Sequence, residues 1–359
     1  MFTIPKKIKR VFLKDKNIHN VIRQIKKKKI NIFLYQFPNY NEINILNRYK
    51  NFKTIFYEHT SFFYFIHYNF QIFKSIYKEY INSKYIVSII PIENDYIFKS
   101  WGIDSILMDN FVTYQYKIIK PSDLSSKTIL MLGRAYDINK RFNLGILAME
   151  YIIKEIPECQ MKIISKLNNS EFLQNLTYNI NLNNNVEFVG FNPKPEIYFK
   201  NASLHVLPSL SESFSLALCE TKIYGIPNIL LGLNYVSLSK GGTVIIYDES
   251  SESIAKEAIK ILNNYNYRKK LGKEARLSTL KLDNKFLLNK WIKLILSVYK
   301  GDIYYQRLKN NDKKLSKMEA LNILGNQLIL IKRRKPNYRN ITINILLNFS
   351  LLYNMNITN

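Results

Sequence analysis

The sequence predicts an α/β protein with two domains, each built on a parallel, doubly wound sheet. The chain has 359 residues, and at about 150 residues per domain this length fits two domains. Short apolar runs alternate with longer amphipathic segments, which is the pattern of strands and helices in successive βαβ units. Hydrophobic residues make up 47% of the chain, so each domain can bury a sizeable core.

The first half shows this alternation in a shortened form. A basic opening segment is mildly amphipathic and is predicted to become helical toward residue 30. The turn-rich sequence Pro121-Ser-Asp-Leu-Ser-Ser is typical of a connection between domains. We therefore assign residues 1–115 to an abbreviated first domain and residues 116–126 to a linker. The predicted strands of this half are residues 31–36, 54–57 and 85–90, and the predicted helices are residues 61–83 and 95–101.

The second half alternates more clearly and defines a second domain at residues 127–282. After it, residues 283–302 carry a strongly amphipathic helix, and residues 303–359 form a C-terminal extension whose Asn-rich end we expect to be loosely packed. The predicted strands are residues 128–132, 161–165, 186–189, 204–207, 228–231 and 244–247. The predicted helices are residues 141–155, 170–180, 195–201 and 214–224, and the chain is mostly helical from residue 253 onward.

The charge and the cysteines limit the class of protein. With 53 Lys and Arg against 27 Asp and Glu, the chain carries a formal charge of +26. This charge favours anionic partners, but Lys, Asn, Ile and Tyr are all abundant, as an AT-rich genome would produce, so a nucleic-acid partner is not predicted. The two cysteines, Cys159 and Cys219, exclude a disulfide scaffold and a multi-cysteine metal site.

The chain shows no secretory signal, and no apolar run approaches the roughly 18 residues of a membrane span. We therefore expect a cytoplasmic protein. The basic amino-terminal segment, which includes Lys26 to Lys29, would allow peripheral contact with an anionic membrane.

Glycine placement argues against two large classes of nucleotide-binding protein. No G-x-G-x-x-G and no G-x-x-x-x-G-K-[ST] occurs, which disfavours a dinucleotide oxidoreductase and a P-loop NTPase. Gly133 and Gly190 fall just after predicted strands. They fit either clearance for a ligand at the carboxyl ends of the strands or plain turn geometry.

An anion site is predicted where the strand that ends at Leu207 leads into the next helix. Ser213 is a plausible N-cap. The amide groups of Phe214, Ser215 and Leu216 would then point outward, and together with the helix dipole they form a ready phosphate site.

Two carboxylates and two cations surround this predicted site. Glu212 and Glu220 would lie about 12 Å apart along a helix, facing different ends of an elongated ligand such as a nucleotide-diphosphate sugar, or lying on an ordinary surface helix. Gly133-Arg134 follows another strand and Lys140 opens the next helix, where cations can neutralise a diphosphate. Because no Asp-x-Asp occurs, we expect no metal and no other cofactor.

Several motifs occur in one order along the second half. They are Gly133-Arg134, Lys140, Phe188-x-Gly190, Tyr198-x-x-x-Ala202, Pro208-Ser209-x-x-Glu212, Glu220, Gly225-x-Pro227, Gly241-Gly242 and Asp248. Over about residues 125–300 this set resembles the retaining glycosyltransferases of GT-B fold that carry a "glycosyl transferases group 1" domain. The resemblance implies two Rossmann-like domains facing a cleft, a nucleotide-sugar donor, and a glycan, lipid or protein acceptor.

The resemblance also implies roles for single residues. Arg134 and Lys140 would contact the donor diphosphate, Glu212 the sugar hydroxyls and Glu220 the ribose. Gly133, Gly190 and Ser213, with the amides of Phe214, Ser215 and Leu216, would complete the donor site. His59, after a strand of the first domain, resembles the family's His-bearing loop that reaches the donor sugar, although a structural histidine is equally compatible with the sequence.

The sequence departs from the family pattern in two places. Ser213 and Ser215 stand where the family usually has glycines, and the glycine-rich acceptor loop after the first strand is missing. We predict a metal-independent hexosyltransferase that retains the anomeric configuration. The alternative is an inactive protein that binds nucleotide sugars through the same fold.

Overall fold

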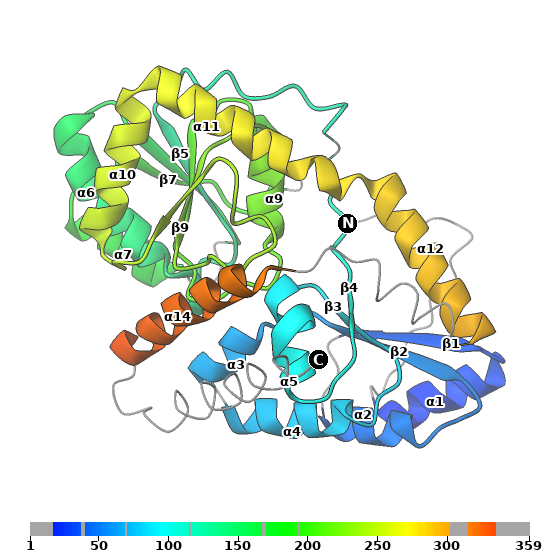
Figure 1. Ribbon diagram of the computed structural model, residues 1–359. Coiled ribbons are helices and arrows are strands. Elements are labelled where there is room, and N and C mark those ends of the chain that lie inside the picture. Colours follow the sequence, from blue (N-terminus) through cyan, green and yellow to red (C-terminus); the bar gives the residue numbers. More distant parts are fainter. Residues whose placement is uncertain are drawn as a thin grey trace.

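The computed structural model describes residues 17–36, 40–68, 70–114, 116–166, 170–192, 194–301 and 315–334. Within these residues the chain forms two parallel sheets with helices packed against them, one sheet per domain (Figure 1). The predicted α/β class with two Rossmann-like domains is confirmed.

The second domain holds a six-stranded sheet in the order β10-β9-β8-β5-β6-β7. The first strand pairs on one side with the second and on the other with the fourth, so the strand order reverses between β5 and β8. In open α/β sheets, ligands bind outside the carboxyl ends of the strands at such a switch point. The strands are β5 Thr128–Leu132, β6 Gln160–Ile164, β7 Val186–Phe188, β8 Leu204–Leu207, β9 Asn228–Leu231 and β10 Thr243–Ile246.

Alternating side chains of the central strand fill two separate cores. Ile129 and Met131 of β5 pack in a cluster with helix α6, whereas Leu130 and Leu132 pack on the other face, near Phe199. Successive side chains of a strand point to opposite faces, so an unbroken apolar run is what a strand buried on both faces requires. The helices are α6 Phe142–Glu155, α7 Glu171–Asn179, α8 Glu196–Phe199, α9 Leu216–Ile223, α10 Ser251–Asn263 and α11 Tyr265–Ser278.

The first domain has a four-stranded parallel sheet in the order β1-β2-β3-β4. Two elements were not predicted: the helix α2 and the two-residue strand β4. The predicted helix at residues 61–83 corresponds to α3 and α4. The strands are β1 Ile32–Gln36, β2 Lys53–Glu58, β3 Ile86–Ser88 and β4 Ile106–Leu107. The helices are α1 Ile18–Lys27, α2 Tyr40–Asn47, α3 Phe62–Tyr68, α4 Phe70–Tyr80 and α5 Phe98–Ser100, the last preceded by a π-helical turn, Glu93–Ile97.

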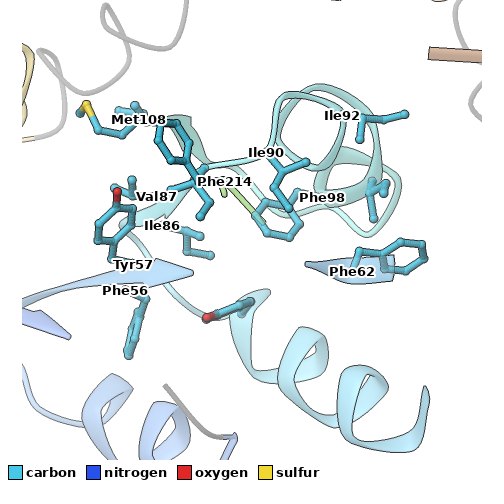
Figure 2. Close-up of a cluster of buried hydrophobic side chains, with 14 of the residues drawn as sticks. Phe56, Tyr57, Phe62, Ile86, Val87, Ile90, Ile92, Phe98, Met108 and Phe214 are labelled. Carbon is cyan, nitrogen blue, oxygen red and sulfur yellow. The ribbon is translucent and has the colours of Figure 1, made fainter. Parts of the chain in front are cut away.

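The two domains meet at the carboxyl edges of their sheets and share one hydrophobic cluster. Phe214, from the loop before α9, is buried in this cluster with a relative exposure of 2%. Figure 2 shows its ring among Val87, Ile90 and Phe98 of the first domain. The loop that follows β8 is therefore anchored in the core that the two domains share.

Two C-terminal helices tie the domains together. Helix α12, Asn284–Lys300, runs from the end of α11 to the first domain (Figure 1), where Trp291 contacts Tyr57 with ring centroids 5.1 Å apart. Helix α14, Lys317–Arg334, lies between the domains, and its Leu330 and Ile331 are buried. The expectation of loose packing near the end of the chain is thus wrong for residues 330–334, and residues 335–359 lie outside the described residues. Among the helices that the structure describes, none is long and apolar enough to cross a bilayer.

Candidate active site

The candidate site lies at the switch point of the second sheet. β5 pairs with β8 in parallel, with Ile129 opposite Leu204 and Leu130 opposite His205. Two loops leave the sheet here: residues 133–141 after β5 and residues 208–215 after β8. Both loops carry residues that the sequence singled out, and the strand pairing brings them together.

Lys140 and Glu212 form the centre of this site. Their side chains make an ion pair of 2.5 Å between Nζ and Oε1, with 16% and 9% of the side-chain areas exposed. Ser209 donates a hydrogen bond of 2.7 Å from its hydroxyl to the same carboxylate oxygen. A charge-assisted pair with so little exposure is held in a defined geometry. The structure therefore joins a cation and a carboxylate that lie 72 residues apart in the chain.

The lysine is positioned by a glycine beneath it. Gly133 has a φ of +147°, and a Cβ placed there would lie 3.5 Å from Cε of Lys140. The positive φ requires glycine, and the lysine stem occupies the space above it. Gly190 has a φ of +83°, so turn geometry accounts for that glycine as well.

The residues on either side of Lys140 hold the opposite loop, a role that the sequence did not predict. Asn139 donates from Nδ2 to the Ser211 carbonyl at 2.8 Å and accepts from the Ser211 amide at 3.1 Å. Arg141 donates from Nε to the Pro208 carbonyl at 2.7 Å and from its guanidinium to Glu249 at 2.9 Å. Three consecutive residues therefore bind one loop. In the sequence, the only sign of this arrangement is that polar residues flank a candidate lysine.

Glu249 receives a second arginine, Arg334 of α14, on the same carboxylate. Burial raises the pKa of Glu249, but the hydrogen bonds and charges of Arg334 and Arg141 outweigh it and hold the pKa below its ordinary value. The C-terminal helix is thus connected through Glu249 and Arg141 to the loop that carries Glu212.

Arg134 takes a different position from Lys140. It pairs with Asp137 at 2.7 Å, and 64% of its side-chain area is exposed. A pair three residues apart at the surface contributes little to stability, so a bound anion can draw the guanidinium away at small cost. The structure does not bring Arg134 into contact with Glu212.

Helix α9 begins later than predicted, which corrects the N-cap. The cap is Ser215, not Ser213, and its hydroxyl accepts a hydrogen bond from the Leu218 amide at 3.4 Å. Ser215 has a φ of 58°, a left-handed conformation that favours glycine. Of the three predicted amides, only that of Leu216 lies in the first turn of the helix.

Glu220 sits one turn into α9, so Glu212 and Glu220 are not both on one helix as the spacing estimate assumed. Burial raises the pKa of Glu220 to about 7, a hydrogen bond with Thr113 lowers it, and the negative charge of Glu196 raises it. Glu220 therefore faces the connection between the domains.

The first domain meets the Glu212 loop through Tyr235. The Glu212 amide donates to the Tyr235 hydroxyl at 3.1 Å, and Ser61 hydrogen-bonds the same hydroxyl. The ring of Phe63 packs on that of Tyr235 with centroids 4.4 Å apart. The loop with His59 and the loop with Glu212 are thus both joined to Tyr235. Tyr235 was missed because an isolated tyrosine carries no motif.

His59 follows β2, with its ring centroid 4.0 Å from that of Tyr57. Burial lowers its pKa to about 4, so the imidazole is neutral at pH 7 and can donate or accept a hydrogen bond. In the second domain, His205 is fully buried beside Asn228, as expected of a core histidine.

Comparison with known proteins bears on this geometry. Residues 115–278 match the family model described as "Glycosyl transferases group 1". The second domain is thus similar to a glycosyl transferases group 1 domain. It includes the Lys140–Glu212 pair, Arg134 and Glu220, together with both loops at the switch point.

A curated relative and several solved structures are similar to the chain. An uncharacterized glycosyltransferase of Haemophilus influenzae is 23% identical over 198 residues, which are 54% of this chain and 55% of that protein. The chain therefore spans about half the length of the curated relative that it matches. Its fold matches sucrose-phosphate synthase of Thermosynechococcus elongatus with a TM-score of 0.66 at 16% identity, covering 79% of this chain and 77% of the other.

Two further structures share the fold. TarM matches with a TM-score of 0.65 at 18% identity over 78% of this chain and 57% of its own. HepE of Anabaena, in complex with UDP and glucose, matches with a TM-score of 0.65 at 11% identity over 78% of this chain and 81% of its own. At these identities the likeness establishes the GT-B fold.

Proposed function

We propose that the protein is a glycosyltransferase that moves a sugar from a nucleotide-diphosphate sugar to an acceptor. The observation that carries this proposal is the ion pair of Lys140 and Glu212, at 2.5 Å, at the switch point of the second sheet. A cation and a carboxylate held together at that edge match the two ends of a sugar diphosphate. The ammonium group can bind the phosphates, and the carboxylate can accept hydrogen bonds from the sugar hydroxyls.

Each side chain of the site takes a separate part of the donor. Lys140 exchanges Glu212 for the diphosphate, and the exposed Arg134 swings in from Asp137 to the same charge. Glu212 then accepts hydrogen bonds from the sugar hydroxyls, and Glu220 accepts them from the ribose. The first-turn amide of Leu216 adds a neutral donor near the phosphates.

The chemistry follows from the cations at the site, Lys140 and Arg134, which face the leaving diphosphate in this proposal. Negative charge grows on the β-phosphate as the glycosidic bond breaks, and stabilisation there accelerates the reaction. We propose a front-face displacement in which the leaving diphosphate takes the acceptor proton, so that the anomeric configuration is retained without metal. Neutral His59 then hydrogen-bonds the sugar from the first domain.

UDP-hexoses are the first donors to test, because HepE was solved with UDP and glucose and the pneumococcal transferase GtfA with UDP and GlcNAc. The acceptor, whether glycan, lipid-linked or protein, enters from the side of the first domain.

The test is turnover of Lys140→Ala. We expect turnover of UDP-glucose, measured as UDP release, to fall at least about a hundredfold because charge on the leaving group is left unstabilised. Lys162→Ala is the matched control, since Lys162 pairs with Glu187 at the surface; it should keep full activity. Equal turnover in Lys140→Ala and the parent would contradict the proposal. Tight donor binding by the parent protein without hydrolysis or transfer would favour the inactive alternative.

A further inference from the structure

Helix α12 is fixed to the first domain along one face. Trp291, Leu294 and Val298 are buried on this face. Lys290 donates from Nζ to the Leu107 carbonyl at 2.7 Å, and Lys53 donates to the Val298 carbonyl at 2.6 Å. These contacts fix the orientation of the helix, and they therefore determine which of its faces points away from the first domain.

The outward face of α12 is apolar. At 100° per residue, positions i, i+4, i+7, i+8 and i+11 form one stripe. The large side chains on this stripe are all substantially exposed: Leu288 51%, Ile292 44%, Ile295 41%, Leu296 48% and Tyr299 59%. Single exposed apolar residues are ordinary, but a contiguous stripe along one helix marks an interaction surface.

Lysines run beside this stripe and no acid interrupts them. Lys293 and Lys300 are exposed and lie along one edge of it, and the exposed Lys285 lies at its N-terminal end. Asn284–Lys300 contains no Asp or Glu. A helix with an apolar face and a flanking row of lysines is the pattern of a helix that lies in the interface of a bilayer.

The basic surface continues past the end of α12. Lys53, bound to the last turn of α12, lines a hollow of about 370 Å³ together with Lys50 and Lys84. A second hollow of about 440 Å³, sharing Phe52, is lined by Lys26 and Lys29. Among the described residues that line the two hollows, none is Asp or Glu.

We propose that the outer face of α12 docks on an anionic lipid surface, with the apolar stripe between the headgroups and the lysines against their phosphates. Charge decides in favour of this partner over a second copy of the chain, because a dimer through α12 would bring two lysine-flanked faces of a chain with net charge +26 together. The inference does not depend on glycosyl transfer, since docking requires no donor.

The experiment is cosedimentation of the full chain, without donor, with vesicles of phosphatidylcholine mixed with phosphatidylglycerol, at low salt. We expect binding to these vesicles and not to vesicles of phosphatidylcholine alone. The Ile292→Ser/Leu296→Ser variant should lower the partition coefficient at least about tenfold. The Lys285→Gln/Lys293→Gln variant should lower it about fivefold per lysine removed.

Matched controls distinguish docking through α12 from nonspecific binding to the vesicles. Phe172 and Tyr178 on α7 are 71% and 69% exposed, so Phe172→Ser/Tyr178→Ser removes comparable apolar area elsewhere and should bind as the parent does. Lys270→Gln/Lys273→Gln on α11 is the corresponding charge control. Circular dichroism and thermal unfolding should match the parent in all four variants, because the altered side chains are exposed.

Three outcomes would overturn the inference. They are failure of the parent to bind anionic vesicles, undiminished binding by the Ile292→Ser/Leu296→Ser variant, and a parent dimer in sedimentation that this variant dissociates without any lipid binding. Loss of UDP-glucose turnover alone would bear on the proposed function and leave docking untouched.

Discussion

The carboxyl group of Glu220 gives the donor site a pH dependence. Burial raises its pKa to about 7, whereas the proposed ribose contact needs the carboxylate form. We expect the affinity for UDP-glucose, whose diphosphate does not titrate in this range, to rise roughly tenfold between about pH 6 and pH 8. Calorimetric titration across this range measures it directly.

Two variants test the assignment of this pH dependence to Glu220. Glu220→Gln should bind with an affinity that is flat across the range. Glu196→Gln should shift the parent's curve to lower pH, because the charge of Glu196 contributes to the raised pKa. The stability of the protein should depend on pH in the opposite direction to donor affinity. Because the pKa of Glu220 is raised in the folded state, that state binds more protons than the unfolded state. The contribution of Glu220 to the free energy of unfolding therefore falls as pH rises toward 7. A parent curve retained in Glu220→Gln would assign the effect to another group.

At the residue scale, sequence reasoning singled out Lys140 and Glu212, which the structure brings together, and missed how their neighbours position them. Lys140 and Glu212 were predicted because a strand end, a cation and a carboxylate each have a recognisable place in an α/β sheet. Asn139 and Arg141 bind backbone carbonyls and amides of a distant loop, which leaves no pattern in the sequence. The N-cap was placed at Ser213 instead of Ser215 because a left-handed serine is rare enough that propensity does not predict it.

At the scale of elements, all six strands of the second sheet were predicted to within about one residue. Strands buried on both faces are unbroken apolar runs, so hydrophobicity alone predicts where they begin and end. The strand β4 has two residues, too few for periodicity to emerge. Helix α14 falls in the part of the chain that was predicted to be mostly helical. Its bounds and its place between the domains were not predicted, because they depend on specific contacts such as the hydrogen bond from Gln327 to the Gly232 carbonyl.

The packing of α14 on the second domain makes a prediction at Gly232. Gly232 has a φ of +67°, and a Cβ there would overlap Cδ1 of Leu330. Gly232→Ala should lower the free energy of unfolding by about 1–2 kcal/mol for the left-handed backbone and by about 1–3 kcal/mol for the overlap. Urea denaturation of the purified variants measures the sum.

Gly102 provides the control for the backbone contribution, because its φ is +71° and a Cβ there meets nothing within 4 Å. Gly102→Ala should therefore show the conformational cost alone. Leu330→Ala should make Gly232→Ala less costly, since the overlapping atom is gone, and a double-mutant cycle isolates that coupling. If both substitutions lowered the free energy of unfolding equally, and Gly232→Ala showed no coupling to Leu330, α14 would not pack on Gly232 in solution.

At the scale of the whole molecule, the two domains are joined through the loop that carries the site. Phe214, two residues after Glu212, lies in the hydrophobic cluster that the two domains share, and Tyr235 connects the Glu212 amide to Ser61. The sequence predicted two domains but not this contact between them, because only the backbone amide of Phe214, and not its side chain, was considered. The position of the loop with Glu212 thus depends on the first domain as much as on the sheet from which the loop emerges.

Phe214→Ala tests this dependence. Removing a buried phenylalanine should lower the free energy of unfolding by about 3 to 5 kcal/mol, and because the lost contacts join two domains, calorimetry should show the single transition of the parent separating into two. Phe142→Ala is the matched control: Phe142 is equally buried at 2% exposure, but it packs wholly within the second domain, so its loss should lower the transition temperature without separating the domains. The affinity for UDP-glucose should fall in Phe214→Ala, since the loop with Glu212 loses its anchor. A single transition in Phe214→Ala, with donor affinity equal to the parent's, would show that the second domain positions its donor loop alone.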